Sequence, residues 1–261
     1  MDNIALVKKV THSQDPTFGF SDPVKWRDSV VADFQRTTGY KMNDRQKRVL
    51  TSALNYRITK SYDKDFQGLI FYDINGIYEV VFTNGDTYFI QFSSEPTHIL
   101  ARTTGRAGYS CEHIDNDAWL GPFHDIALMN STAYFTTYDG EWIGRLNIRW
   151  AETPEGKVVV GVDPNIYPYS TAYAERPNEL LKEAVYYILK DELNYREAKT
   201  PYLYKGHSDT TSQYPNVQLP YKGYHKLMES IQPKPSFEEP YDNWEDDFSW
   251  QMRFDFMAED L

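Results

Sequence analysis

The chain has 261 residues, of which 16% are aromatic and 25% charged, and it carries a net charge of −11. This length can bury a sizeable core, no stretch approaches the 18 or so apolar residues of a membrane span, and the N-terminus does not resemble a signal peptide. The only cysteine, Cys111, cannot form an intramolecular disulfide, so we expect a cytoplasmic protein without membrane contacts.

Charge is distributed unevenly along the chain. Residues 1–60 contain 11 Lys and Arg against 6 Asp and Glu, whereas residues 236–261 contain 9 Asp and Glu against one Arg. The two ends therefore carry opposite charge, which bears on association with partners more than the average does.

A first helix is predicted over residues 22–38. Asp22 can cap its N-terminus, Pro23 suits the first turn, and Gly39 suits a left-handed C-terminal cap. One face is apolar at helical spacing, through Trp26, Val30, Val31 and Phe34.

A second helix is predicted over residues 43–59, where Asn43 and Gln46 match a capping box. Leu50, Leu54 and Ile58 form its apolar stripe. Its other faces are basic, through Arg45, Lys47, Arg48 and Arg57.

An antiparallel meander is predicted over residues 68–102. Two Asn-Gly pairs, Asn75–Gly76 and Asn84–Gly85, can each supply the positive φ angles of a tight hairpin turn, so three strands are expected over 68–92. A fourth strand is expected over 98–102. We expect both N-terminal helices to pack against one sheet.

A long loop, a second hairpin and a third helix are predicted in the next part of the chain. Residues 103–131 are predicted to form a long ordered loop, a type of segment that is often functional. Residues 132–192 predict a hairpin turning at Asp139–Gly140, a further strand, and an amphipathic helix over about 178–192.

Residues 199–235 are rich in Tyr and Pro and are expected to be irregular. The fold class predicted is therefore α+β, with antiparallel meanders packed with N-terminal helices and one later amphipathic helix. We predict a single domain over residues 1–235 and an acidic, aromatic tail over 236–261.

The densest group of reactive side chains lies in the predicted loop. A thiol and imidazoles close together can form a nucleophile with its base, which makes Cys111, His113 and His124 candidate catalytic residues. The alternative is a polar loop whose side chains bond to backbone groups of its turns. Since no C-x-x-C or H-x-x-x-H spacing occurs, we predict no metal site, and we predict no cofactor.

The order hairpin, strand and amphipathic helix over residues 132–192 resembles the central part of the GCN5-related acetyltransferases. In that family a glycine-rich turn before a helix offers backbone N–H groups to the pyrophosphate of coenzyme A. The expected turn is absent before Leu180, and an R-x-x-G-x-A match occurs instead at Arg102, Gly105 and Ala107.

Short motifs elsewhere are similar to uncharacterised proteins encoded by bacteriophages. They are Ser110–Cys111, an arginine–tryptophan strand over 144–150, and Asp163 with Tyr167. The resemblance implies a viral origin and no activity. Arg145, Arg149 and Asp163 are candidates for a binding surface, although strand alternation favours placing Arg145, Asn147 and Arg149 on a solvated face.

The tail combines seven aromatic residues with its acids. Acids can steer such a segment to a basic groove, and rings can anchor it there, so Trp244, Phe248 and Trp250 are candidate binding residues. The alternative is a segment that packs on its own domain, and both apply if it docks on the basic N-terminal helices.

Three classes of function remain. We favour a non-enzymatic protein-interaction protein that engages a protein partner through the acidic, aromatic tail and a Tyr-rich surface. The second is an enzyme, either acetyltransferase-like or dependent on Cys111 with His113 or His124. The third is a nucleic-acid binder using residues 22–60, with the acidic tail competing for the same surface.

Overall fold

The computed structural model describes residues 3–12, 20–62, 74–104, 113–114, 121–140, 142–152, 157–162, 175–193, 195–203 and 253–257. Within them the strands are β1 (Ile4–His12), β2 (Gly76–Phe82), β3 (Thr87–Ser93), β4 (Ser131–Thr137), β5 (Trp142–Glu152), β6 (Val158–Val162), β7 (Arg196–Leu203) and β8 (Arg253–Met257). The helices are α1 (Pro23–Thr38), α2 (Asp44–Ser61), α4 (Pro96–Ala101), α5 (Gly121–Ala127) and α6 (Glu175–Tyr187), and a π-helical turn (Ile188–Glu192) extends α6.

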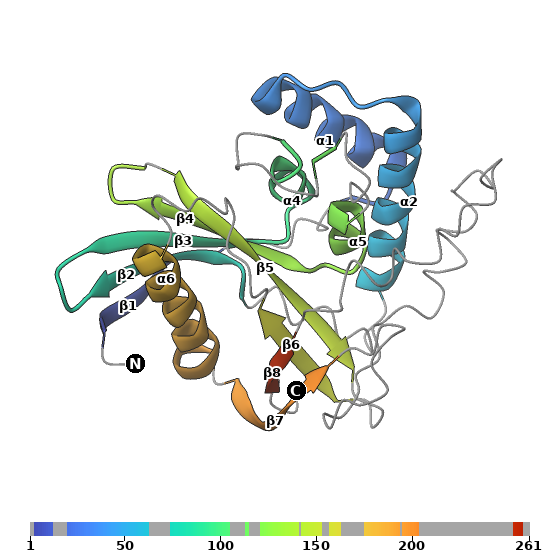
Figure 1. Cartoon of the computed structure of the whole chain (residues 1–261). Coiled ribbons are helices and arrows are strands. Elements are labelled where there is room, and N and C mark those ends of the chain that lie inside the picture. The colour runs from blue at the N-terminus through green and yellow to red at the C-terminus, as the bar shows by residue number, and fades with distance from the viewer. Residues whose placement is uncertain are drawn as a thin grey trace, which may run out of the picture.

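The strands form one antiparallel sheet in the order β1-β2-β3-β4-β5-β6-β8-β7. The first six strands are neighbours in chain order, so they form a continuous meander (Figure 1). With the helices packed beside it, this confirms the predicted α+β class. None of the described helices is long and apolar enough to cross a membrane.

One face of the sheet is apolar and packs against α6. Alternate residues of β2 to β6 join Leu181, Ala184, Val185, Ile188 and Leu189 in one buried cluster. These residues form one apolar face, so the amphipathic helix that the sequence predicted over about 178–192 is confirmed.

The helices α1, α2, α4 and α5 gather on the other side of the sheet (Figure 1). Their apolar residues, among them Trp26, Phe34, Leu50, Leu54 and Phe123, form a second buried cluster. The apolar faces of α1 and α2 thus pack on each other and on α4 and α5, and these two shorter helices lie next to the sheet.

Both N-terminal helices have the predicted caps. The Asp22 carboxylate accepts from the backbone N–H of Val24 at 2.8 Å, and Gly39 takes a left-handed φ of 77° at the end of α1. At the start of α2, Asn43 and Gln46 form a reciprocal capping box with both distances at 2.9 Å.

The two Asn-Gly pairs occupy different positions relative to the strands. Asn84–Gly85 connects β2 to β3, with Gly85 at a φ of 92° and its N–H bonded to the Phe82 carbonyl at 2.9 Å, as predicted. The strand predicted before Asn75–Gly76 lies, but for its last residues, outside the described residues; Asn75 is buried, Gly76 already belongs to β2, and β2 pairs with β1 and β3. The third strand of the predicted meander is β1, which pairs with β2 from the N-terminus.

Three further segments differ from the sequence prediction. Residues 96–101 form helix α4 where a strand was predicted over 98–102, and Pro96 suits the first turn of that helix. The predicted loop 103–131 contains helix α5. Residues 196–203, partly expected to be irregular, form β7.

Part of the predicted tail is integrated into the sheet. Residues 253–257 form β8, which pairs with β6 on one side and with β7 on the other. The acidic, aromatic region is therefore anchored at 253–257, and residues 204–252 connect β7 to β8.

Candidate functional site

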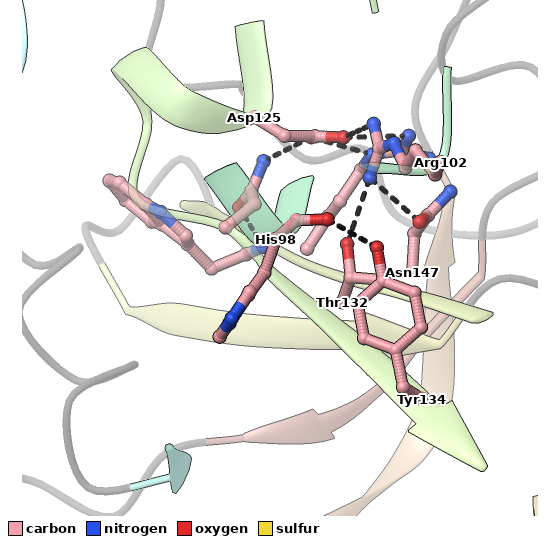
Figure 2. Close-up of polar contacts among 9 residues, drawn as sticks. His98, Arg102, Asp125, Thr132, Tyr134 and Asn147 are labelled. Atoms are coloured by element: carbon pink, nitrogen blue, oxygen red, sulfur yellow. Dashed lines mark hydrogen bonds and ion pairs between the residues drawn. The ribbon is translucent and has the colours of Figure 1, made fainter. Parts of the chain in front are cut away.

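Polar side chains gather where α4 and α5 meet strands β4 and β5. Asp125 of α5 is 1% exposed and is contacted by two guanidinium groups (Figure 2). Arg149 of β5 donates to it twice, from Nε to Oδ1 at 3.0 Å and from Nη2 to Oδ2 at 3.2 Å. Arg102, which follows α4, pairs with Oδ2. The Asn130 amide donates to Oδ1 at 2.8 Å.

Arg102 extends this group onto the sheet. Its second terminal nitrogen donates to Asn147 Oδ1 at 2.7 Å and to Thr132 Oγ1 at 3.1 Å. Thr132 and Asn147 face each other across the β4–β5 pair. We call Arg102, Asp125, Asn130, Thr132, Asn147 and Arg149 the Asp125 cluster. It joins two helices to two strands through side-chain bonds.

Burial and charge act in opposite directions on Asp125. Burial alone would raise the pKa of its carboxyl, but the charges and hydrogen bonds of Arg102 and Arg149 outweigh burial and hold that pKa well below its usual range. Asp125 is therefore ionised at neutral pH and accepts hydrogen bonds without exchanging a proton. At that pH the Asp125 carboxylate is a permanent negative charge that balances the nearby arginines.

The arginines of β5 are not on a solvated face. Arg145 is fully buried, Asn147 is 2% exposed and Arg149 is 7% exposed, so the preferred interpretation of the alternation was wrong. The alternation itself is correct, since Leu146, Ile148 and Trp150 point into the apolar cluster on the opposite face. The second face is covered because Arg102 and Asp125, from the segments of α4 and α5, contact Asn147 and Arg149.

A second buried arginine contact ties α2 to this region. Arg57 donates to the Ser94 carbonyl at 2.6 Å, and its guanidinium lies 5.6 Å from the centre of the Trp26 ring. The hydroxyls of Ser94 and Ser131 both lie within hydrogen-bond distance of Asn75 Oδ1, at 3.3 and 3.2 Å. Asn75 therefore bridges the ends of β3 and β4 from a buried position.

His98 of α4 lies beside the Asp125 cluster (Figure 2). Its Nδ1 is 2.7 Å from Ser93 Oγ, and its backbone carbonyl accepts the Tyr134 hydroxyl. Burial lowers the pKa of His98 below its usual value, and the nearby Glu95 opposes this in part. His98 is thus biased toward the neutral form.

An open groove of about 530 Å³ lies on the outer side of α1 and α2. It is lined by Arg27, Asp28, Val31, Ala32, Gln35, Asp44, Lys47 and Arg48. Arg27 bonds to Asp28 at 2.6 Å, whereas Lys47 and Arg48 make no ion pair with any described residue. We call this the α1–α2 groove. Its two uncommitted cations make it suited to an anionic partner.

The predicted site residues fall in different places. Cys111, Asp163, Trp244, Phe248 and Trp250 lie outside the described residues. His113 is half-buried, and His124 is buried beside Asp125 in α5. Arg149 and Asp125 are brought together, and Arg145 lies two residues before Asn147 on the same face of β5.

Sequence reasoning missed the roles of Arg102, Thr132 and Asn147. Arg102 was noted only in a short glycine motif, and its partners are 23 to 45 positions away along the chain. No local pattern could have paired them. The one usable signal was the density of reactive side chains in the predicted loop, a stretch that also contains Asp125.

Among the residues that the structure describes, no three His, Cys, Asp or Glu side chains come close enough to hold a metal ion. Comparison with known proteins finds no match for this chain among protein-family models, curated proteins or solved structures.

Proposed function

We propose that this chain is a protein-interaction protein that engages a protein partner through its acidic, aromatic region. The observation that supports this proposal is that β8, which lies within that region, pairs with both β6 and β7. The residues just before β8, 236–252, contain six acidic and no basic residues, together with five aromatic rings. These residues join the sheet directly at the start of β8, which supports the proposal.

The composition explains how such a segment binds. Buried aromatic rings supply most of the energy of interfaces, while acids raise the rate of encounter and orient the segment. Exposed tyrosines add to the contact surface, since Tyr62 is 74% exposed and Tyr138 is 70% exposed. Tyrosine is enriched at interfaces because its ring is apolar and its hydroxyl can bond to polar groups.

The test is a capture experiment with the full chain and two matched triple variants. Replacing Trp244, Phe248 and Trp250 by alanine should abolish capture of the partner. Replacing Tyr214, Tyr221 and Tyr224 removes as many rings from the Tyr-rich, non-acidic stretch and should reduce capture by less. Reversing the charge of Glu245, Asp246 and Asp247 should mainly slow association. Equal capture by all variants would contradict the proposal.

A second candidate is nucleic-acid binding by residues 22–60, which the positive charge of Lys47 and Arg48 in the α1–α2 groove favours. An enzyme dependent on Cys111 with His113 or His124 stays a prediction, and no described contact favours it. A viral origin likewise stays an expectation from resemblance.

A further inference from the structure

The α1–α2 groove has the chemistry of a peptide-binding site. Lys47 and Arg48 supply positive charge, and Val31 and Ala32 supply an apolar strip between the helices. A volume of about 530 Å³ falls in the usual range of ligand sites, about 300 to 1,000 Å³. The groove can therefore hold a few side chains at once.

We propose that this groove binds residues 236–252 of the same molecule, and that this contact competes with the partner. The inference rests on the proposed function, because it places the same acidic segment in the groove when no partner is bound. Charge complementarity supports it, since residues 22–60 carry nine Lys and Arg against four Asp and Glu, and residues 236–252 carry six acids and no base.

The groove favours an acidic, aromatic peptide over a nucleic acid. Two carboxylates, Asp28 and Asp44, line it among its cations, so its positive charge is discontinuous and suits the separate acids of a peptide better than a continuous row of phosphates. A peptide can place its acids next to Lys47 and Arg48 and its rings against Val31 and Ala32. Tryptophan and phenylalanine are suited to such a strip because they bury large apolar areas.

The chain is long enough for the contact within one molecule. An extended segment spans about 3.3 to 3.6 Å per residue, so the 17 residues from 236 to 252 reach about 55 Å from the start of β8. A compact chain of this length has a radius of gyration of about 18 Å. The segment can therefore reach a groove on the far side of the molecule.

The experiment measures binding of a fluorescent peptide of residues 236–252 to the full-length protein. The peptide should bind the chain carrying Trp244→Ala, Phe248→Ala and Trp250→Ala about tenfold more tightly than it binds the unmodified chain, because the replacement vacates the groove. Adding Lys47→Glu and Arg48→Glu should then weaken binding about tenfold or more. Lys25→Glu with Lys41→Glu makes the same charge change at exposed residues outside the groove and should weaken it less than about threefold.

Several results would overturn the inference. They are equal binding to the vacated and unmodified chains, equal loss in the two charge-reversal variants, and a groove-dependent dimer of the unmodified chain in solution. Tighter groove-dependent binding of a single-stranded oligonucleotide than of the peptide would assign the groove to nucleic acid instead. If ring replacement abolishes partner capture while the peptide fails to bind the groove, the proposed function stands and only this inference falls.

Discussion

Asp125 is a buried carboxylate that three other side chains of the Asp125 cluster contact. It bonds to Arg102, Arg149 and Asn130, and it is the single carboxylate among the buried charged side chains of the described residues, where four arginines are also buried. Removing one partner of a buried ion pair leaves the other charge uncompensated, which costs more than the pair contributes.

Asp125→Asn should therefore lower the free energy of unfolding by about 3 to 5 kcal/mol, the usual cost of breaking a buried pair, as measured by urea denaturation. Asp33→Asn is a matched control, because Asp33 pairs with Arg36 at 2.9 Å on the surface. Exposed pairs contribute about 0 to 1 kcal/mol, so the control should change little. Equal effects would show that the Asp125 cluster does not stabilise the fold.

Stability should also depend on pH through Asp125. The folded pKa of its carboxyl is depressed, so the stabilisation is fully present above the unfolded pKa of about 3.9 and is lost as pH falls toward the folded pKa. The difference in unfolding free energy between the unmodified chain and Asp125→Asn should be constant above about pH 5 and shrink below about pH 4. A difference that stays constant into strong acid would contradict the assignment.

The burial of Arg145 and Arg149 could not be predicted from the alternation of residues along β5. Strand alternation identifies which residues share a face, and that was correct for Arg145, Asn147 and Arg149. Whether the face meets water depends on what covers it. Here α4 and α5 come from segments whose sequence predicted a strand and a loop.

At the scale of elements, the sequence correctly predicted those caps and turns whose contacts join residues close together in the chain. The caps at Asp22, Gly39 and Asn43 and the turn at Asn84–Gly85 depend on residues within a few positions of each other. Asn75–Gly76 has the same two residues, but Gly76 pairs with His12 of β1, which lies 64 positions earlier in the chain. Such a pairing has no local signature.

The two glycines give a matched test. Gly76 has a φ of 148°, and a Cβ there would lie 2.4 Å from the Thr11 carbonyl oxygen of β1, whereas Gly85 has a φ of 92° and open space around it. Gly85→Ala should cost about 1 to 2 kcal/mol from backbone conformation alone. Gly76→Ala should cost more, because β1 must also shift, and urea midpoints of the two variants check this order. A smaller cost at Gly76 would show that β1 contributes little.

Strand β8 gives a prediction about the C-terminal region. Ending the chain after residue 252 removes the strand between β6 and β7 and leaves backbone groups of both without partners. We expect a lower urea midpoint and faster amide exchange in β6. Ending it after Met257 preserves β8 and should leave both unchanged, and identical behaviour of the two truncations would show that β8 does not stabilise the sheet.

At the scale of the whole molecule, two apolar clusters meet across a polar boundary. One cluster lies between the sheet and α6, and the other lies among α1, α2, α4 and α5. Between them lie the Asp125 cluster, the bond from Arg57 to Ser94, and Asn75 with its two serines. Hydrogen bonds and ion pairs require closer geometry than apolar contacts, so this boundary fixes how the two clusters are placed.

If the polar boundary makes the two clusters unfold together, weakening it should separate them. In the unmodified chain, amides of Leu50–Arg57 in α2 and of Leu146–Ile148 in β5 should exchange through openings of similar free energy. In Asp125→Asn the helical cluster should open first, so amides of α2 should exchange faster than those of β5, because α6 and the sheet retain their apolar cluster. Native-state hydrogen exchange at increasing denaturant measures both sets. An equal fall in both would mean that the clusters are coupled by the chain connections and apolar contacts, and that the Asp125 cluster stabilises the molecule without joining its two parts.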